Sequence, residues 1–273
     1  ICEVPNSVLP RLNRTFQPSP SAAAIRFNYT TSPFSFTFFR TSTRGVFFAT
    51  ASPLIIFELQ YLRVKTALPP NADICCLGEH ADSFHLPTFN MTRALWSRDA
   101  CDMPTGPILC CNPPVYFEHR YNGPHGVFLF NSNGMDVRMT YAESTNGGVT
   151  LEYDVLGGVL DFYFLAGSGK DPLEMSGLCE KIVGTLTEVP HWSFRLHQCR
   201  FGYTRFIDVA NVITIYSAAE IPLETMCPDI DYMKGRQIFT VDPSYLPLPR
   251  MCDIVQYLHA HNRKSASSSI ATQ

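Results

Sequence analysis

The sequence predicts a β-sandwich followed by the start of a parallel α/β domain, and three observations indicate this fold class. Of the 273 residues, 45% are hydrophobic and 16% charged, with 20 Phe and 12 Tyr, a composition too apolar for disorder that favours strands. Short apolar or alternating runs broken by Pro, Gly and Asn fill residues 25–166. Over residues 191–262 the pattern changes to strands that alternate with amphipathic helices.

The first part of the chain is expected to be an extended lead-in and then the sandwich. Residues 1–24 hold four prolines among Ser and Ala runs, which resist regular structure. Further on, Asn122-Gly123 and Asn133-Gly134 suit the positive φ of tight turns. The expected strands are residues 35–39, 45–48, 54–57, 115–117, 126–130 and 158–165. This spacing of aromatic and β-branched runs is typical of an antiparallel sandwich.

Residues 167–190 are expected to be a linker with a connecting helix, and residues 191–262 the α/β part. Strand candidates at residues 194–199 and 221–227 each precede a helical pattern. The apolar residues of the two patterns are Phe206, Val209, Ala210, Ile213 and Tyr216, and then Leu248, Met251, Cys252, Val255 and Leu258. Chemistry in such a layout gathers at the carboxyl ends of the strands, and Asp229 and Asp231 lie just past one such end.

The α/β part is expected to be truncated. Two strands and two helices cannot close an eight-unit barrel, and an open parallel pair would leave apolar faces bare. After Asn262, where a third buried strand should begin, residues 263–273 form a polar, Ser-rich tail instead.

Composition and charge exclude several classes of function. Lys and Arg total 21 against 24 Asp and Glu, a net charge of −3, so no basic field is present to bind nucleic acid. The longest apolar stretches, residues 53–57 and 159–165, fall far short of the roughly 20 residues that span a membrane. Gly167-Ser168-Gly169-Lys170 is followed by Asp171 and is a turn rather than a phosphate loop. We expect no cofactor.

The cysteines and sequons favour a secreted protein without a metal centre. No two of the 10 cysteines have the two-residue separation of zinc ribbons. Glycosylation sequons stand at Asn13, Asn28 and Asn90, which is compatible with a secreted glycoprotein in which some cysteines pair. The chain starts at Ile1 without a leader, so any secretion signal is expected to have been removed or to lie outside it.

Several motifs, taken together and in order, resemble the amino-terminal part of the α-glucosidases of glycoside hydrolase family 31, particularly the secreted fungal enzymes. The resemblance runs from about Ile25 to Asn262. The motifs are Leu77-Gly78-Glu79-His80, Leu95-Trp96-Ser97-Arg98-Asp99, Pro114–His119, Asn131–Asp136, Tyr153 with Leu156-Gly157-Gly158, His197–Tyr203 and Asp229–Met233.

The resemblance implies a galactose-mutarotase-like β-sandwich, the first two units of a (β/α)8 barrel and retaining hydrolysis of terminal α-linked glucose. Retention needs one carboxyl group as nucleophile and another as acid. The family's nucleophile is the Asp of a Trp-x-Asp-Met-Asn-Glu motif, and its acid is a later Asp. Neither Trp96 nor Trp192, the two Trp residues here, begins that motif. The chain alone is therefore expected to be inactive, with maltose or α-glucan sugars as its partners.

Five residues are expected to contact substrate because they match family positions. Asp229 matches the aspartate that binds hydroxyls of the cleaved glucose, and Asp231 follows it. Arg98 and Asp99 match a sandwich loop that reaches over the barrel mouth, and Tyr203 would offer an aromatic wall. Structural alternatives stay open: a solvated loop pair for the two aspartates, a surface ion pair for Arg98 with Asp99, and packing for Tyr203.

Where the sequence departs from the family, cysteines replace other residues. Typical relatives carry Tyr-Gly in place of Cys75-Cys76, Tyr-Gly-Asn-His in place of the segment 110–113, and Trp-Thr in place of Cys227-Pro228. Loss of an aromatic and gain of Pro beside Asp229 predict a distorted subsite. A decaying gene copy would account for this. The alternatives to an α-glucosidase-like chain are a non-catalytic sugar-binding or interaction module and a chain that does not fold stably; the oligomeric state is open.

Overall fold

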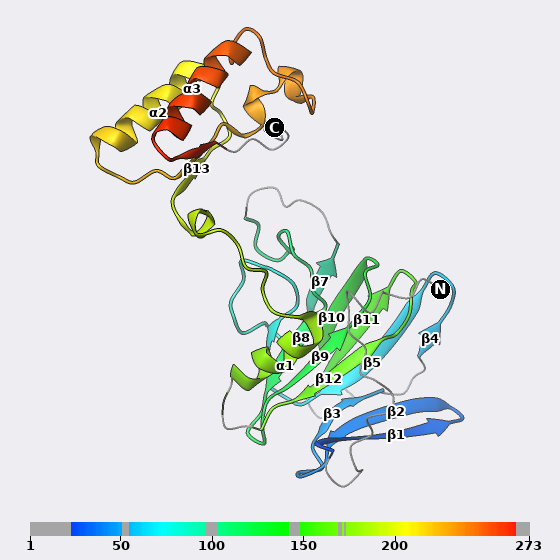
Figure 1. Ribbon diagram of the computed structural model, residues 1–273. Helices are drawn as coiled ribbons and strands as arrows, with labels where there is room; N and C mark the ends of the chain where they lie inside the picture. The colour runs from blue at the N-terminus through cyan, green and yellow to red at the C-terminus, as the bar shows by residue number, and fades with distance from the viewer. Residues whose placement is uncertain are drawn as a thin grey trace, which may run out of the picture. The chain divides into compact units, whose positions relative to one another are not determined.

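The computed structural model describes residues 23–50, 55–96, 103–141, 148–168, 171 and 173–265. The chain divides into two compact units, Ile1–Thr185 and Leu186–Gln273. The first is mostly sheet and the second combines short strands with helices (Figure 1). In the described ranges, no helix combines the length and apolar character that crossing a membrane requires.

Among the described residues of the first unit, the strands form three sheets in which neighbouring strands pair antiparallel (Figure 1). The first sheet has the order β1-β2-β3, with β1 at Ile25–Thr31, β2 at Phe34–Arg40 and β3 at Val46–Ala49. The second has the order β4-β5-β11-β10-β7, formed by Ile56–Phe57, Leu62–Leu68, Val149–Val155, Met135–Tyr141 and Met91–Leu95. The third has the order β12-β9-β8-β6, formed by Phe162–Ala166, His125–Leu129, Val115–His119 and Asp73–Cys76. The predicted β-rich character is confirmed.

One hydrophobic core joins these sheets because alternate side chains of each strand point to the same side. Along β5 the buried positions are Leu62, Val64, Thr66 and Leu68, and the residues between them are more exposed. Val64 of the five-stranded sheet and Ile74 of the four-stranded sheet belong to the same buried cluster. Aromatic rings of the β1-β2-β3 sheet pack against this cluster. Phe38 of β2 stacks on Phe164 of β12 with 3.8 Å between ring centroids.

Helix α1, Leu173–Val183, follows the last strand of this unit and packs against β12. Its one buried side chain, Met175, lies against glycines of two neighbouring segments. A Cβ on Gly126 or Gly167 would come within 3.1 or 2.9 Å of Met175, so the close approach of the helix depends on both glycines. The guanidinium of Arg40 links the segments at Gly167 and Pro124 by donating hydrogen bonds to their carbonyls at 2.5 and 2.9 Å.

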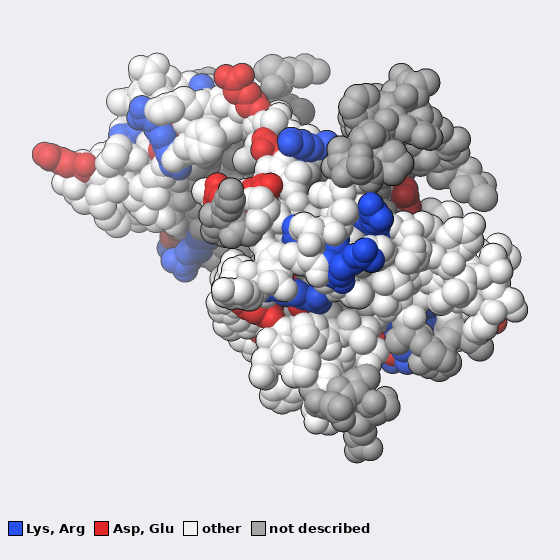
Figure 2. Space-filling view, turned by 90° about the horizontal axis from the view of Figure 1, so that it is seen from below, with Lys and Arg blue, Asp and Glu red and all other residues white. Residues whose placement is uncertain are grey.

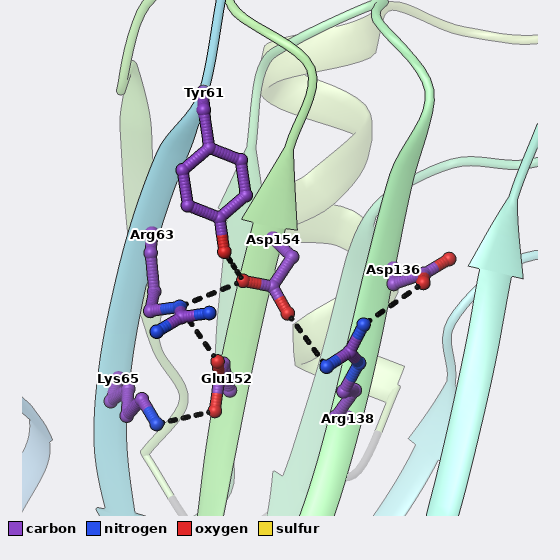
Figure 3. A network of polar contacts seen from close by, with 7 residues as sticks. All are labelled: Tyr61, Arg63, Lys65, Asp136, Arg138, Glu152 and Asp154. Carbon is purple, nitrogen blue, oxygen red and sulfur yellow. Dashed lines mark hydrogen bonds and ion pairs between the residues drawn. The ribbon is translucent and has the colours of Figure 1, made fainter. Parts of the chain in front are cut away.

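The outward face of β5, β11 and β10 carries a network of charged side chains (Figure 3). Arg63 bridges Glu152 and Asp154 at 2.9 and 3.0 Å, and the hydroxyl of Tyr61 donates to Asp154 at 2.5 Å. Lys65 pairs with Glu152 at 2.6 Å, and Arg138 lies 3.4 Å from Asp154. Three cations therefore face three carboxylates, counting Asp136, which Arg138 also approaches. The positive and negative charges of these side chains therefore cancel on this face of the sheet.

In the view of Figure 2, basic and acidic side chains are interspersed on a largely uncharged surface.

The second unit has a parallel sheet with the order β13-β14-β15. Its strands are His197–Cys199, Thr225–Cys227 and Lys264–Ser265. The helices are α2 at Phe206–Ala218 and α3 at Leu248–Ala260, with 3-10 turns at His191–Phe194, Asp229–Tyr232 and Lys234–Arg236. Val209 and Ile213 of α2, Leu258 of α3 and Met226 of β14 form its core.

The two helices predicted from apolar spacing are confirmed, and both strands form, with later starts than expected. After Asn262 the polar segment forms a two-residue third strand that is not buried. Lys264 and Ser265 pair in register with Thr225 and Met226, and the Lys264 amide donates to the Glu224 carbonyl at 2.7 Å. Polar side chains are tolerated there because strand pairing is made by backbone groups, which every residue supplies.

The charged network should contribute measurably to stability. We expect Asp154→Asn to lower the free energy of unfolding by about 1–2 kcal/mol at pH 7, because the amide loses charge-assisted bonds from Tyr61 and Arg63. Urea unfolding at several pH values measures this. Burial raises the pKa of Asp154, but hydrogen bonds from Tyr61 and Arg63 outweigh burial and hold the pKa below its usual value.

A carboxyl with a lowered folded-state pKa stabilises the fold fully above its unfolded pKa of about 3.9, and this stabilisation is lost as pH falls through the folded pKa. The difference between wild type and Asp154→Asn should therefore shrink below about pH 4. Asp136→Asn is the matched control, since Asp136 is more exposed, and should cost less than about 0.5 kcal/mol. Equal losses in the two variants would contradict the assignment.

Candidate functional site

The candidate site lies where β13 and β14 end. The strands are parallel and pair His197 with Thr225 and Cys199 with Cys227, so their carboxyl ends meet at one edge. Beyond β13 the chain turns through Gly202 into α2, and beyond β14 it enters the 3-10 turn that begins at Asp229. Both turns therefore leave the sheet at the same edge, which is where ligands of parallel α/β folds bind.

Asp231 joins these two turns. Its Oδ2 accepts a hydrogen bond from the Gly202 amide at 2.6 Å. Gly202 has a φ of +103°, which favours glycine, so this turn can present its N–H inward without strain. The Asp231 carboxylate is thus engaged in holding the strand ends together.

Asp229 has a different environment. It is half-buried and has a φ of +59°, a left-handed conformation that Asp tolerates better than most residues. Its Oδ1 accepts from the following amide, of Ile230, at 2.8 Å. Its Oδ2 faces the Cys199 thiol at 4.0 Å, a weak donor at the limit of contact. Asp229 therefore presents a carboxylate oxygen beside the strand ends, next to a group that binds it weakly.

Tyr203 lies in the core of this unit, with 2% of its surface exposed. Its hydroxyl accepts from Gln198 Nε2 at 2.8 Å, and Gln198 Oε1 accepts from the Tyr216 hydroxyl at 2.6 Å. The Arg200 guanidinium covers the ring at 5.6 Å from its centroid. In this unit the ring packs and anchors β13 to α2; the predicted role as a sugar-facing wall stays a prediction.

The other residues expected from the sequence are placed in part. Arg98, Asp99 and Asn13 lie outside the described residues. Trp96, just before Arg98, is 47% exposed, and its ring lies over Gly134, where a Cβ would come within 3.0 Å. The two described sequon residues, Asn28 on β1 and Asn90 before β7, are both exposed.

A thiol pair at the strand ends was not found by sequence reasoning. Cys199 and Cys227 stand 28 positions apart in the chain, and the strand register makes them neighbours. Burial, the Cys227 thiol and the Asp229 charge raise the pKa of Cys199 to about 11. The eight described cysteines are free. No group of three or more His, Cys, Asp or Glu in the described ranges is arranged to hold a metal.

The first unit contains a second titratable cluster, but it is closed to solvent. Glu118 and His125 have no exposed surface. The Glu118 carboxylate accepts hydrogen bonds from the Arg120 guanidinium at 2.5 and 2.8 Å. Burial, with the nearby arginine charges, lowers the pKa of His125 to about 3, so the ring is neutral at pH 7. Burial raises the pKa of Glu118 against the opposing effect of Arg120. The cluster serves packing, since no ligand can reach it in this structure.

Similarity to known proteins covers nearly all of the chain. The family model of the glycosyl hydrolases family 31 TIM-barrel domain matches residues 187–271. A probable alpha/beta-glucosidase of Arthroderma benhamiae is 46% identical over 265 residues, covering 96% of this chain and 30% of that protein. A probable alpha/beta-glucosidase of Aspergillus fumigatus is 45% identical over 264 residues, covering 96% of this chain and 29% of that protein. The chain thus spans less than a third of the length of these relatives.

Solved structures share the fold at low identity. The glucosidase II alpha subunit matches with a TM-score of 0.73 and 17% identity, over 91% of this chain and 31% of that one. A Flavobacterium johnsoniae family 31 dextranase matches with a TM-score of 0.69 and 18% identity, over 90% of this chain and 29% of that one. At these identities the likeness concerns the fold.

The contact between Asp231 and Gly202 should control the rigidity of the strand ends. We expect Asp231→Ala to speed hydrogen exchange at the Gly202 amide by about tenfold, because the amide loses its acceptor. Exchange followed by NMR or mass spectrometry measures this. Asp231→Asn is the control: its side-chain carbonyl still accepts, so the acceleration should be smaller. Unchanged exchange in the Ala variant would show that the contact does not hold the turn.

Proposed function

This chain belongs to glycoside hydrolase family 31, and from that premise we propose that it forms part of a secreted α-glucosidase. The proposed domains are a lead-in at residues 1–24, a galactose-mutarotase-like sandwich at 25–166, a linker with a helix at 167–190, the first two barrel units at 191–262 and a tail at 263–273. The division of the chain after Thr185 and the barrel-domain match to residues 187–271 support this arrangement.

The observation that carries the proposed function is the position of Asp229 at the carboxyl end of β14. A carboxylate there can accept charge-assisted hydrogen bonds from two neighbouring sugar hydroxyls. Its Oδ2 faces a thiol at 4.0 Å, which a sugar hydroxyl would displace at little cost because S–H is a weak donor. We assign Asp229 to the glucose subsite. We assign Asp231 to an indirect part in it, because its carboxylate already binds Gly202.

Hydrolysis with retention needs a nucleophile and an acid on opposite sides of the scissile bond, with their carboxyl groups about 5–5.5 Å apart. The nucleophile motif of the family is not among the 273 residues. We therefore propose that these residues alone bind glucose weakly and do not turn it over, while the longer relatives complete the barrel. A non-catalytic sugar-binding module is not favoured by the comparisons, because the curated relatives are named as glucosidases.

The substrate class proposed is terminal α-linked glucose, as in maltose and α-glucans. The fungal relatives are named for both linkages, as probable alpha/beta-glucosidases. A secreted protein would carry glycans at its sequons, and the exposure of Asn28 and Asn90 would allow their modification. Arg98 and Asp99 are proposed to lie near the sugar that follows the cleaved glucose.

Calorimetric titration of the 273-residue chain with maltose tests the subsite. We expect saturable binding with a Kd on the order of 1 mM or weaker, about −4 kcal/mol, because a partial subsite makes few contacts. Asp229→Ala should abolish it, since the hydroxyls lose their acceptor. Asp253→Ala is the matched control, because Asp253 is an exposed residue of α3, and this variant should bind as the parent chain does. Absence of binding in the parent chain would contradict the assignment of Asp229.

The same preparations tested with aryl α- and β-glucosides check the proposed lack of turnover. We expect neither substrate to be hydrolysed above the buffer rate. Hydrolysis by the parent chain that is lost in Asp229→Ala would show that the chain holds its own catalytic carboxylates.

A further inference from the structure

The Cys199 and Cys227 thiol pair has the geometry for a covalent link. The two residues are register partners on neighbouring parallel strands, so their side chains point to the same face of the sheet. Neighbouring strands lie about 4.7–4.9 Å apart. This separation falls within the Cα–Cα range of about 4.4–6.8 Å that disulfides span.

The two thiols lie near enough to influence each other, and Cys199 can be reached from solvent. Hydrogen bonding between the Cys199 and Cys227 side chains contributes to the raised pKa of Cys199, after burial. Cys199 is exposed and Cys227 is half-buried. A small reagent can therefore reach Cys199, and Cys227 is already in place to react next.

We propose that Cys199 and Cys227 are a redox-active pair, which a small disulfide such as oxidised glutathione converts into a disulfide joining the ends of β13 and β14. The Cys199 thiolate attacks one sulfur of oxidised glutathione and releases one glutathione thiolate. The Cys227 thiolate then attacks the Cys199 sulfur of the mixed disulfide and releases the second. Two protein thiols lose two protons and two electrons, and one oxidised glutathione becomes two reduced glutathiones.

Cys75, Cys76 and Cys252 lack this geometry. Cys75 and Cys76 have their sulfurs 3.8 Å apart, but they are consecutive residues. Consecutive Cα atoms lie about 3.8 Å apart, below the usual disulfide range. Cys252 is exposed on α3, where the reaction would stop at the mixed disulfide with glutathione. The redox proposal concerns a bond between two strands and does not depend on sugar binding.

Peptide mapping of the full chain tests the proposal. After incubation with oxidised glutathione at pH 8.5, remaining thiols are alkylated and the chain is cut with trypsin. We expect residues 196–200, which contain Cys199, to be joined to residues 206–234, which contain Cys227. Cys199→Ser and Cys227→Ser should each remove this linked peptide, and Cys252→Ser should leave it unchanged. Reduction with dithiothreitol should separate the two peptides.

Two further measurements keep the test independent of how the Ser variants fold. The parent chain in concentrated urea should form the linked peptide at least about tenfold less, because the strand register that joins the thiols is lost. The native reaction should speed up by about tenfold per pH unit between pH 7 and 9, because the Cys199 thiolate fraction rises tenfold per unit below its pKa. Glutathione adducts on Cys199 and Cys227 without the linked peptide, or equal linkage in urea, would overturn the proposal.

Discussion

The parallel register of β13 against β14 is the constraint on which the candidate site depends. It sets Cys199 beside Cys227 and makes both strands end at one edge, so the turns that follow them also meet. Asp231 then joins the turns through the Gly202 amide. A register shift of one residue would move Cys227 to the other face and carry Asp229 away from the turn after β13. The short parallel pair therefore sets the position of each polar group of the site.

The carboxylates discussed above include several that are paired with arginine or lysine and one, Asp229, that has a weakly bound oxygen. On the outward face of β5, β11 and β10, Asp154 pairs with Arg63 of β5 and Arg138 of β10. Glu152 pairs with Arg63 and Lys65, both of β5. Glu118 is likewise held by Arg120. Such carboxylates stabilise the sheet and have little capacity left for a ligand. Asp229 differs because its Oδ2 has a thiol at 4.0 Å as its neighbour, and this weak contact supports the proposal that Asp229 accepts hydrogen bonds from a sugar.

The sequence predicted elements whose pattern is local. Helices α2 and α3 were predicted because their apolar residues recur at helical spacing, and β2, β8 and β9 because they are aromatic or apolar runs. Strands β5, β10 and β11 were missed because their outward positions are charged, and only cross-strand partners make those charges acceptable. The place of Asp229 after a strand was predictable. That Asp231 binds the Gly202 amide and that Cys199 lies beside Cys227 both depend on the strand register. The pattern of neighbouring residues in the sequence could not predict either.

The departure from the family pattern at Cys227-Pro228 affects both the proposed sugar binding and the proposed disulfide. The resemblance to the family implies Trp-Thr at these positions, and relative to that pattern Cys227-Pro228 lacks an aromatic ring and a backbone N–H immediately before Asp229, which we propose binds the sugar. That loss weakens stacking against a sugar and is one reason to expect weak binding. The same change places a small thiol opposite Cys199, where a Trp side chain could form no bond to sulfur. On the two proposals, the same pair of residues weakens the sugar subsite and supplies the second thiol of the redox link between the strands.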